Sequence, residues 1–133
     1  MSMGLFGRKG DEDDRRRLGE DREHAARLPE LMEAVATAES ALAAAHEEGV
    51  GVEELNRLGK VLDTALTDAV RAAYAQERVL VGERGYSDRI YRRKRLARPE
   101  VRVATERAER LLTARERHRL QGVERVPRRP AGV

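Results

Sequence analysis

The sequence predicts an all-α protein built around an antiparallel helical hairpin. Apolar residues recur at three- and four-residue steps over two long stretches, and no stretch shows the strict alternation of a strand. Glycines follow both stretches, and prolines stand where helices are expected to begin. Leu, Val, Ile and Phe together number only 28 of 133 residues, so we expect a thin core of Leu, Val and Ala.

Residues 1–27 are predicted to form a flexible charged arm, because they contain runs of acidic and basic residues and no apolar periodicity. The only phenylalanine of the chain, Phe6, stands beside Leu5 in this arm. An apolar side chain outside the core can anchor in a partner's pocket. We interpret Leu5 and Phe6 as a candidate docking peptide, and the alternative is an ordinary unstructured terminus.

Residues 28–82 are predicted to form the hairpin. Its first helix begins at Pro29 and runs to about Glu48, where Gly49-Val50-Gly51 ends it. The second helix carries the most continuous apolar stripe of the chain, and so short a connection implies that the two helices run antiparallel. The residues predicted to pack against a partner helix are Leu55, Leu58, Leu62, Leu66, Ala69, Ala73 and Leu80.

Residues 83–121 are predicted to form two shorter basic helices that fold back on the hairpin or project from it. Ser87 is the expected N-cap of the first, which runs to about Ala97, and Pro99 opens the second, which runs to about Gln121. Residues 122–133 contain two further prolines and are predicted to be an extended basic tail.

The charge of the chain is strongly polarised. From Arg84 onward there are sixteen Lys and Arg against six Asp and Glu, whereas the preceding part has eleven against eighteen. The net charge of +3 therefore hides an acidic half and a basic half. A dense basic segment attracts polyanions or acidic surfaces.

The basic residues cluster on the first of the two later helices and in the tail, and they form the candidate site for a polyanion or an acidic partner. These residues are Arg89, Arg92, Arg93, Lys94, Arg95, Arg98, Arg125, Arg128 and Arg129. They could neutralise phosphates of a nucleic acid. They could equally pair with the acidic half of the same or a neighbouring copy, or form a solvated helix face. No DNA-reading motif is present, so contact with the backbone is favoured over readout of bases.

The sequence offers no catalytic, cofactor-binding or metal-binding constellation. His24, His46 and His118 stand in three different segments, and His46 lacks a second histidine four residues later, as a zinc-binding helix would need. No glycine-rich phosphate loop and no serine elbow occurs. We therefore expect no enzyme, no cofactor and no small-molecule substrate.

The absence of cysteine excludes disulfides and thiolate metal sites. No apolar run is long enough to span a membrane, and the first ten residues lack the apolar stretch of a secretory signal. We expect a cytoplasmic protein, or one packaged into a particle that assembles in the cytoplasm. Arginine outnumbers lysine 24 to 3, a bias that we attribute to a GC-rich genome of bacterial or phage origin.

These observations favour a non-enzymatic interaction protein, a small structural or adaptor subunit of a larger assembly such as a virion or a multi-subunit particle. Its thin core suggests that it is stabilised by a protein partner or by self-association. The alternative is a nucleic-acid-binding accessory protein that uses its basic C-terminal helices on the phosphate backbone.

Overall fold

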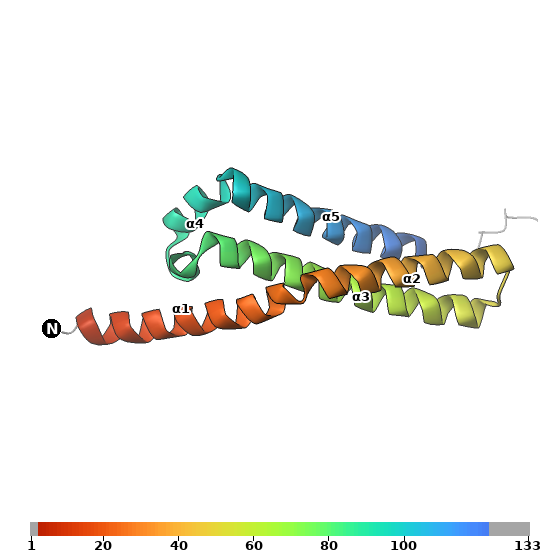
Figure 1. Cartoon of the computed structure of the whole chain (residues 1–133), viewed down its shortest axis with the longest axis horizontal. Coiled ribbons are helices and arrows are strands. Elements are labelled where there is room, and N and C mark those ends of the chain that lie inside the picture. Colours follow the sequence, from red (N-terminus) through yellow and green to blue (C-terminus); the bar gives the residue numbers. More distant parts are fainter. Residues whose placement is uncertain (1–2, 123–133) are drawn as a thin grey trace, which may run out of the picture.

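The computed structural model describes residues 3–122, with side chains described for residues 9–121. Over this range the chain forms five α-helices, one 3-10 turn and no strand, which confirms the predicted all-α class. The four long helices lie lengthwise in an elongated bundle, and a short one lies obliquely at one end (Figure 1).

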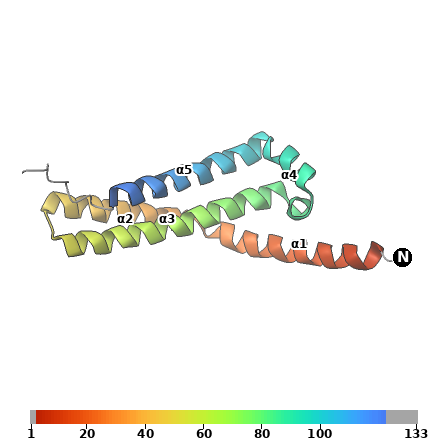
Figure 2. The same cartoon turned by 180° about the vertical axis from the view of Figure 1, so that it is seen from behind.

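The first helix, α1, spans Met3–Ala26 and corrects the prediction of a flexible arm over residues 1–27. Leu18 is buried against the bundle, and the Asp14 side chain is also buried. Leu18 is the only buried apolar residue between 9 and 26, so this part of α1 has no periodic apolar face. Polar contacts to residues that are distant in sequence therefore help to hold α1 against the bundle. The first turns of α1 extend past the turn that follows α3 (Figures 1 and 2).

The second helix, α2, spans Leu28–Glu48 and follows α1 after a single residue, Arg27. Pro29 stands in its first turn, where a missing N–H costs no helical hydrogen bond. At its other end Gly49 adopts the left-handed conformation, with φ of 69°. The N–H groups of Gly49 and Val50 donate hydrogen bonds to the carbonyls of His46 and Ala45. This is a common helix terminator that favours glycine.

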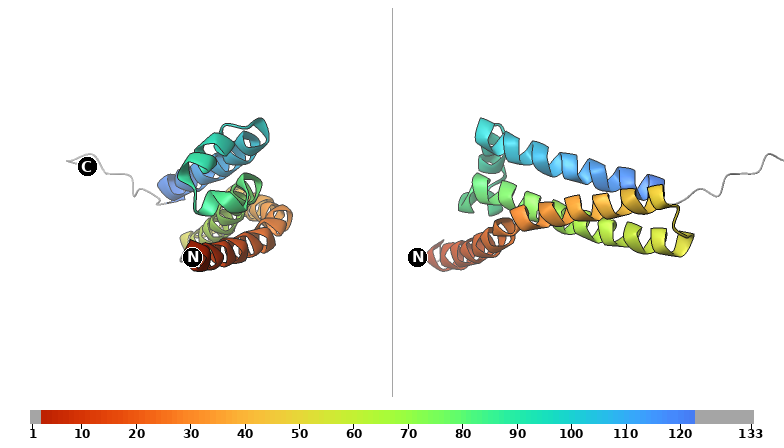
Figure 3. Two further views of the ribbon diagram at one scale, coloured as in Figure 1. Left: turned by 90° about the vertical axis from the view of Figure 1, so that its left-hand side faces the viewer. Right: turned by 45° about the vertical axis from the view of Figure 1, so that its right-hand side comes forward.

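The third helix, α3, spans Val52–Val81 and lies at the centre of the bundle. The consecutive helices α1 and α2 pack along one side of α3, and the last helix packs along another side (Figures 1 and 3). Since every other long helix packs on α3, it has more buried residues than any other helix within residues 9–121. Its buried residues are Leu62, Leu66, Ala69, Val70, Ala72, Ala73, Ala75, Glu77 and Val81.

The chain turns after α3 through Gly82, whose φ of 101° is a conformation that side chains rarely adopt. The 3-10 turn η1 spans Glu83–Tyr86, and α4 spans Arg89–Leu96. The predicted cap of α4 was wrong by one residue: the Asp88 carboxylate, not Ser87, accepts a hydrogen bond from the Tyr91 N–H at 2.9 Å. Ser87 instead donates to Asp14 of α1 at 2.7 Å.

The last helix, α5, spans Pro99–Gly122. With 24 residues it is longer than α2, which has 21, so only α4 is a short helix as predicted. The α5 helix packs along α3 through Ala108 and Leu111. A polar seam accompanies this contact, since Thr105 donates to the buried Glu77 carboxylate at 2.6 Å.

The core is thin and rich in alanine. The buried cluster shared by α2, α3 and α5 includes four alanines that are at most 1 % exposed: Ala69, Ala72, Ala73 and Ala108. Small side chains let helices approach closely but bury little apolar area each. Packing therefore depends on close contact along the length of α3.

Candidate binding surface

The basic helix α4 lies at one end of the bundle, and the turn between α2 and α3 lies at the other end (Figures 1 and 2). The α4 helix is tied to the end of α3 by Arg95, which donates to the Leu80 carbonyl at 2.9 Å and to the Val81 carbonyl at 3.4 Å. The last carbonyls of a helix carry partial negative charge and lack helical partners. Arg95 is thus a positioning residue of α4, and its other contact is a distant ion pair with Glu100 at 4.0 Å.

The remaining cations of the predicted cluster are exposed and make no ion pair within residues 9–121. These five residues are Arg89, Arg92, Arg93, Lys94 and Arg98. We call them the α4 basic face. Elsewhere many basic residues are paired: Arg78 binds Asp21, Arg84 binds Asp88 and Arg119 binds Asp63. The α4 basic face therefore has no acidic partner within the described part of its own chain.

An exposed apolar side chain lies within the α4 basic face. Ile90 is 71 % exposed, although it stands between Arg89 and the half-buried Tyr91. It borders a shallow depression to which α1 contributes Asp11 and the turn contributes Ser87 and Asp88. The surface around α4 thus combines cations, two acidic residues and one large apolar group.

The turn that carries α4 is joined to α1 by a polar network. Arg78 donates two hydrogen bonds to the Asp21 carboxylate, at 2.8 and 3.1 Å, and Tyr86 donates a third through its hydroxyl. Burial disfavours the charged form of Asp21, but these donors outweigh it, so the pKa of Asp21 lies below its usual value. Burial, together with the hydrogen bond to Asp21, raises the pKa of Tyr86.

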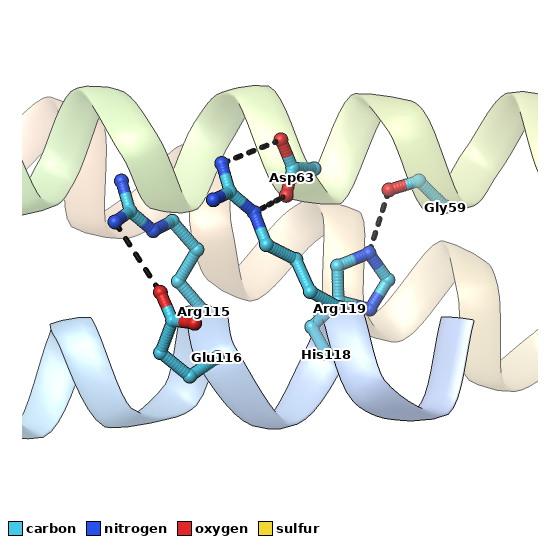
Figure 4. A network of polar contacts seen from close by, with 6 residues as sticks. All are labelled: Gly59, Asp63, Arg115, Glu116, His118 and Arg119. Carbon is cyan, nitrogen blue, oxygen red and sulfur yellow. Dashed lines mark hydrogen bonds and ion pairs between the residues drawn. The ribbon is translucent and has the colours of Figure 1, made fainter. Parts of the chain in front are cut away.

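At the opposite end, a cleft of about 760 Å³ lies between α2, α3 and the end of α5. Figure 4 shows two contacts at this place: Arg119 binds the Asp63 carboxylate at 2.8 Å, and the His118 Nε2 atom donates to the Gly59 carbonyl at 2.7 Å. The hydrogen bond from Arg119 lowers the pKa of Asp63. These contacts join α5 to α3. Holding the two helices together is a structural role, and it explains why these side chains lie close to one another.

The structure places the other predicted site residues as follows. The helix-packing residues Leu62, Leu66, Ala69 and Ala73 are buried, and Leu55, Leu58 and Leu80 are half-buried. The predicted docking residues Leu5 and Phe6 lie within α1, but their side chains are outside the described residues. Arg125, Arg128 and Arg129 lie outside the described residues altogether.

Sequence reasoning missed Asp21, Tyr86 and Ile90. Asp21 and Tyr86 are separated by 65 residues, so no local pattern links them. The exposure of Ile90 was missed because burial of an apolar residue on a two-turn helix cannot be judged from spacing alone.

No group of three or more His, Asp or Glu side chains in residues 9–121 is placed to hold a metal ion. No helix in the described part of the chain is long and apolar enough to cross a membrane. Comparison with family models, characterised proteins and solved structures finds no match to this chain.

Proposed function

We propose that the protein is a non-enzymatic interaction protein, a structural or adaptor subunit, that binds an acidic protein surface through α4. The observation that supports this proposal is the α4 basic face, five exposed cations without an ion-pair partner in residues 9–121. Four of these cations lie on α4, and like charges held close together on one helix repel one another. An acidic partner would relieve that repulsion and would be attracted over a distance by the same charges.

The exposed apolar group on this surface favours a protein as the partner. Protein interfaces commonly place an apolar anchor inside a polar rim, and Ile90 with the surrounding cations has this composition. Phosphate binding makes no use of an exposed isoleucine. Asp11, which borders the same depression, would moreover repel a nucleic acid backbone.

Nucleic-acid binding is the second candidate, because five exposed cations between residues 89 and 98 could each neutralise a phosphate. The two candidates differ in one measurable property. Binding to phosphate depends steeply on salt and little on Ile90, whereas binding to a protein should be weakened by both Ile90→Ala and loss of charge.

The test is affinity purification of the tagged protein from its native host, followed by mass spectrometry. We expect a partner that is retained by the wild type and lost with the triple variant Arg89→Glu, Arg92→Glu and Arg93→Glu. The matched control is Arg102→Glu, Arg110→Glu and Arg117→Glu, three exposed arginines of α5, which should retain the partner. Equal retention by all three proteins would contradict the proposal.

A gel-shift titration with random duplex DNA and single-stranded RNA at about 50 mM salt, where the Debye length exceeds 10 Å, tests the second candidate. A shift that disappears in the α4 triple variant, but not in Ile90→Ala, would replace the protein-binding proposal with the nucleic-acid one.

A further inference from the structure

An acidic surface that matches α4 lies at the opposite end of the same molecule. The tip of the α2–α3 hairpin carries three glutamates, Glu47, Glu48 and Glu53, that are exposed and form no ion pair within residues 9–121. The fourth, Glu54, is already bound to Arg57. We call these three glutamates and the adjoining Val52 the acidic tip.

The acidic tip also includes an exposed apolar side chain. Val52, the first residue of α3, is 61 % exposed between the glutamates that precede and follow it. Ile90 has the corresponding place in the α4 basic face and is 71 % exposed. Each surface thus has one large exposed apolar side chain, bordered by cations on α4 and by carboxylates on the acidic tip.

The two surfaces of one molecule cannot meet. The acidic tip stands at the beginning of α3, whereas α4 follows its end, and 30 residues of helix separate them. At 1.5 Å of rise per residue this helix is about 45 Å long. Pairing between the two surfaces therefore requires two copies of the chain.

We infer that the acidic surface recognised by α4 is the acidic tip of a second copy of this chain, so that copies associate end to end. This inference rests on the proposed function of α4 and names its partner. The contact is heterologous, because it joins different surfaces of the two copies. Each added copy presents a new acidic tip or a new α4, so association continues until a ring closes or an open chain forms.

The test uses charge exchange between the two surfaces. One variant carries Arg89→Glu, Arg92→Glu and Arg93→Glu, and the other carries Glu47→Arg, Glu48→Arg and Glu53→Arg. Glu54 is left unchanged because it binds Arg57. In each variant both surfaces have the same sign, whereas the mixture offers complementary pairs of both kinds.

The weight-average mass is measured by sedimentation at about 20 mM and about 300 mM salt. At these concentrations the Debye length is respectively longer and shorter than at physiological ionic strength. We expect wild type to form oligomers at low salt that dissociate at high salt, and each variant alone to remain monomeric. The equimolar mixture should recover the wild-type mass at low salt. Circular dichroism of each variant checks that the helices are retained, and the α5 control with Arg102→Glu, Arg110→Glu and Arg117→Glu should associate as wild type does.

A wild-type protein that stays monomeric at low salt, or a mixture that fails to associate, overturns the inference. Neither result removes the proposed function, provided that the α4 triple variant still loses its partner from the native host. Failure of both experiments removes both proposals.

Discussion

The Asp21 carboxylate of α1 and the Arg78 guanidinium of α3 form a two-point ion pair, with distances of 2.8 and 3.1 Å, although the two residues are 57 positions apart in sequence. This pair, together with the Tyr86 hydroxyl, holds a helix that has little apolar surface of its own. Because these contacts are polar and lie outside the apolar core, a substitution at Asp21 tests the attachment of α1 separately from the stability of the core.

Replacing Asp21 with Asn should weaken the attachment of α1. The amide cannot accept two charge-assisted hydrogen bonds from Arg78, and hydrogen bonds of this kind are worth about 1.5–3 kcal/mol each when well formed. Because Arg78 is partly exposed, we expect a smaller loss, of about 1–2 kcal/mol. Hydrogen exchange should accelerate in α1 and remain slow in α3. Glu23→Gln, at an exposed position of the same helix, is the control and should leave exchange unchanged.

Acid should detach α1 through the same residue. The pKa of Asp21 is lower in the folded protein than its ordinary value, so its contribution to stability is present above about pH 4, the ordinary value for Asp. That contribution is lost as the pH falls through the lower, folded-state pKa. Hydrogen exchange of α1 measured from about pH 6 to about pH 3, corrected for the intrinsic exchange rate, should show this loss. In Asp21→Asn the corrected profile of α1 should be flatter, and identical profiles in the two proteins would contradict the assignment.

Two glycines should respond in opposite directions to alanine. At Gly59 an added Cβ would have His118 Cε1 as its nearest neighbour, at 3.8 Å, which is ordinary contact. Because alanine is the better helix former, Gly59→Ala should raise the free energy of unfolding by about 0.5–1 kcal/mol.

At Gly85 an added Cβ would overlap the Val81 Cγ1 atom. Val81 is buried and its branched side chain has little freedom to move. Gly85→Ala should therefore lower stability by about 1–3 kcal/mol, as overpacking does. Urea denaturation of both variants decides the matter, and a Gly85→Ala protein as stable as wild type would show that the turn adapts.

The close packing of α3 should not tolerate a larger side chain. Ala73 is 1 % exposed within the cluster shared by α2, α3 and α5, so Ala73→Leu should cost about 1–3 kcal/mol. The same substitution at the exposed Ala41 of α2 should have little effect on the urea midpoint. If the two variants unfold at the same urea concentration, the contact at Ala73 is looser than the structure indicates.

The all-helical class could be predicted because the apolar residues of α2 and α3 repeat with the helical period over many turns. The end of α2 at Gly49 could also be predicted from local sequence, because helices commonly end at a glycine in the left-handed conformation. The helix α1 could not be predicted from its apolar residues, because Leu18 is the only buried apolar residue between 9 and 26. Its hydrogen bonds from Ser87 to Asp14 and from Tyr86 to Asp21 join distant parts of the chain.

The candidate site was only partly predictable. Composition located the cations of α4, but it could not separate Arg95, which binds the last carbonyls of α3, from Arg92 and Arg93, which remain exposed. It also could not show that Ile90 faces solvent. Both facts depend on the position and orientation of α4 at the end of α3, which the turn at Gly82 sets.

The central place of α3 has a consequence for synthesis of the protein. Helices α1 and α2 pack mainly on α3, which follows them in the chain. Their contacts with α3 can therefore form only after the matching turns of α3 have been synthesised, and a nascent chain arrested before Val52 would present Leu28, Leu31 and Val35 to chaperones and proteases.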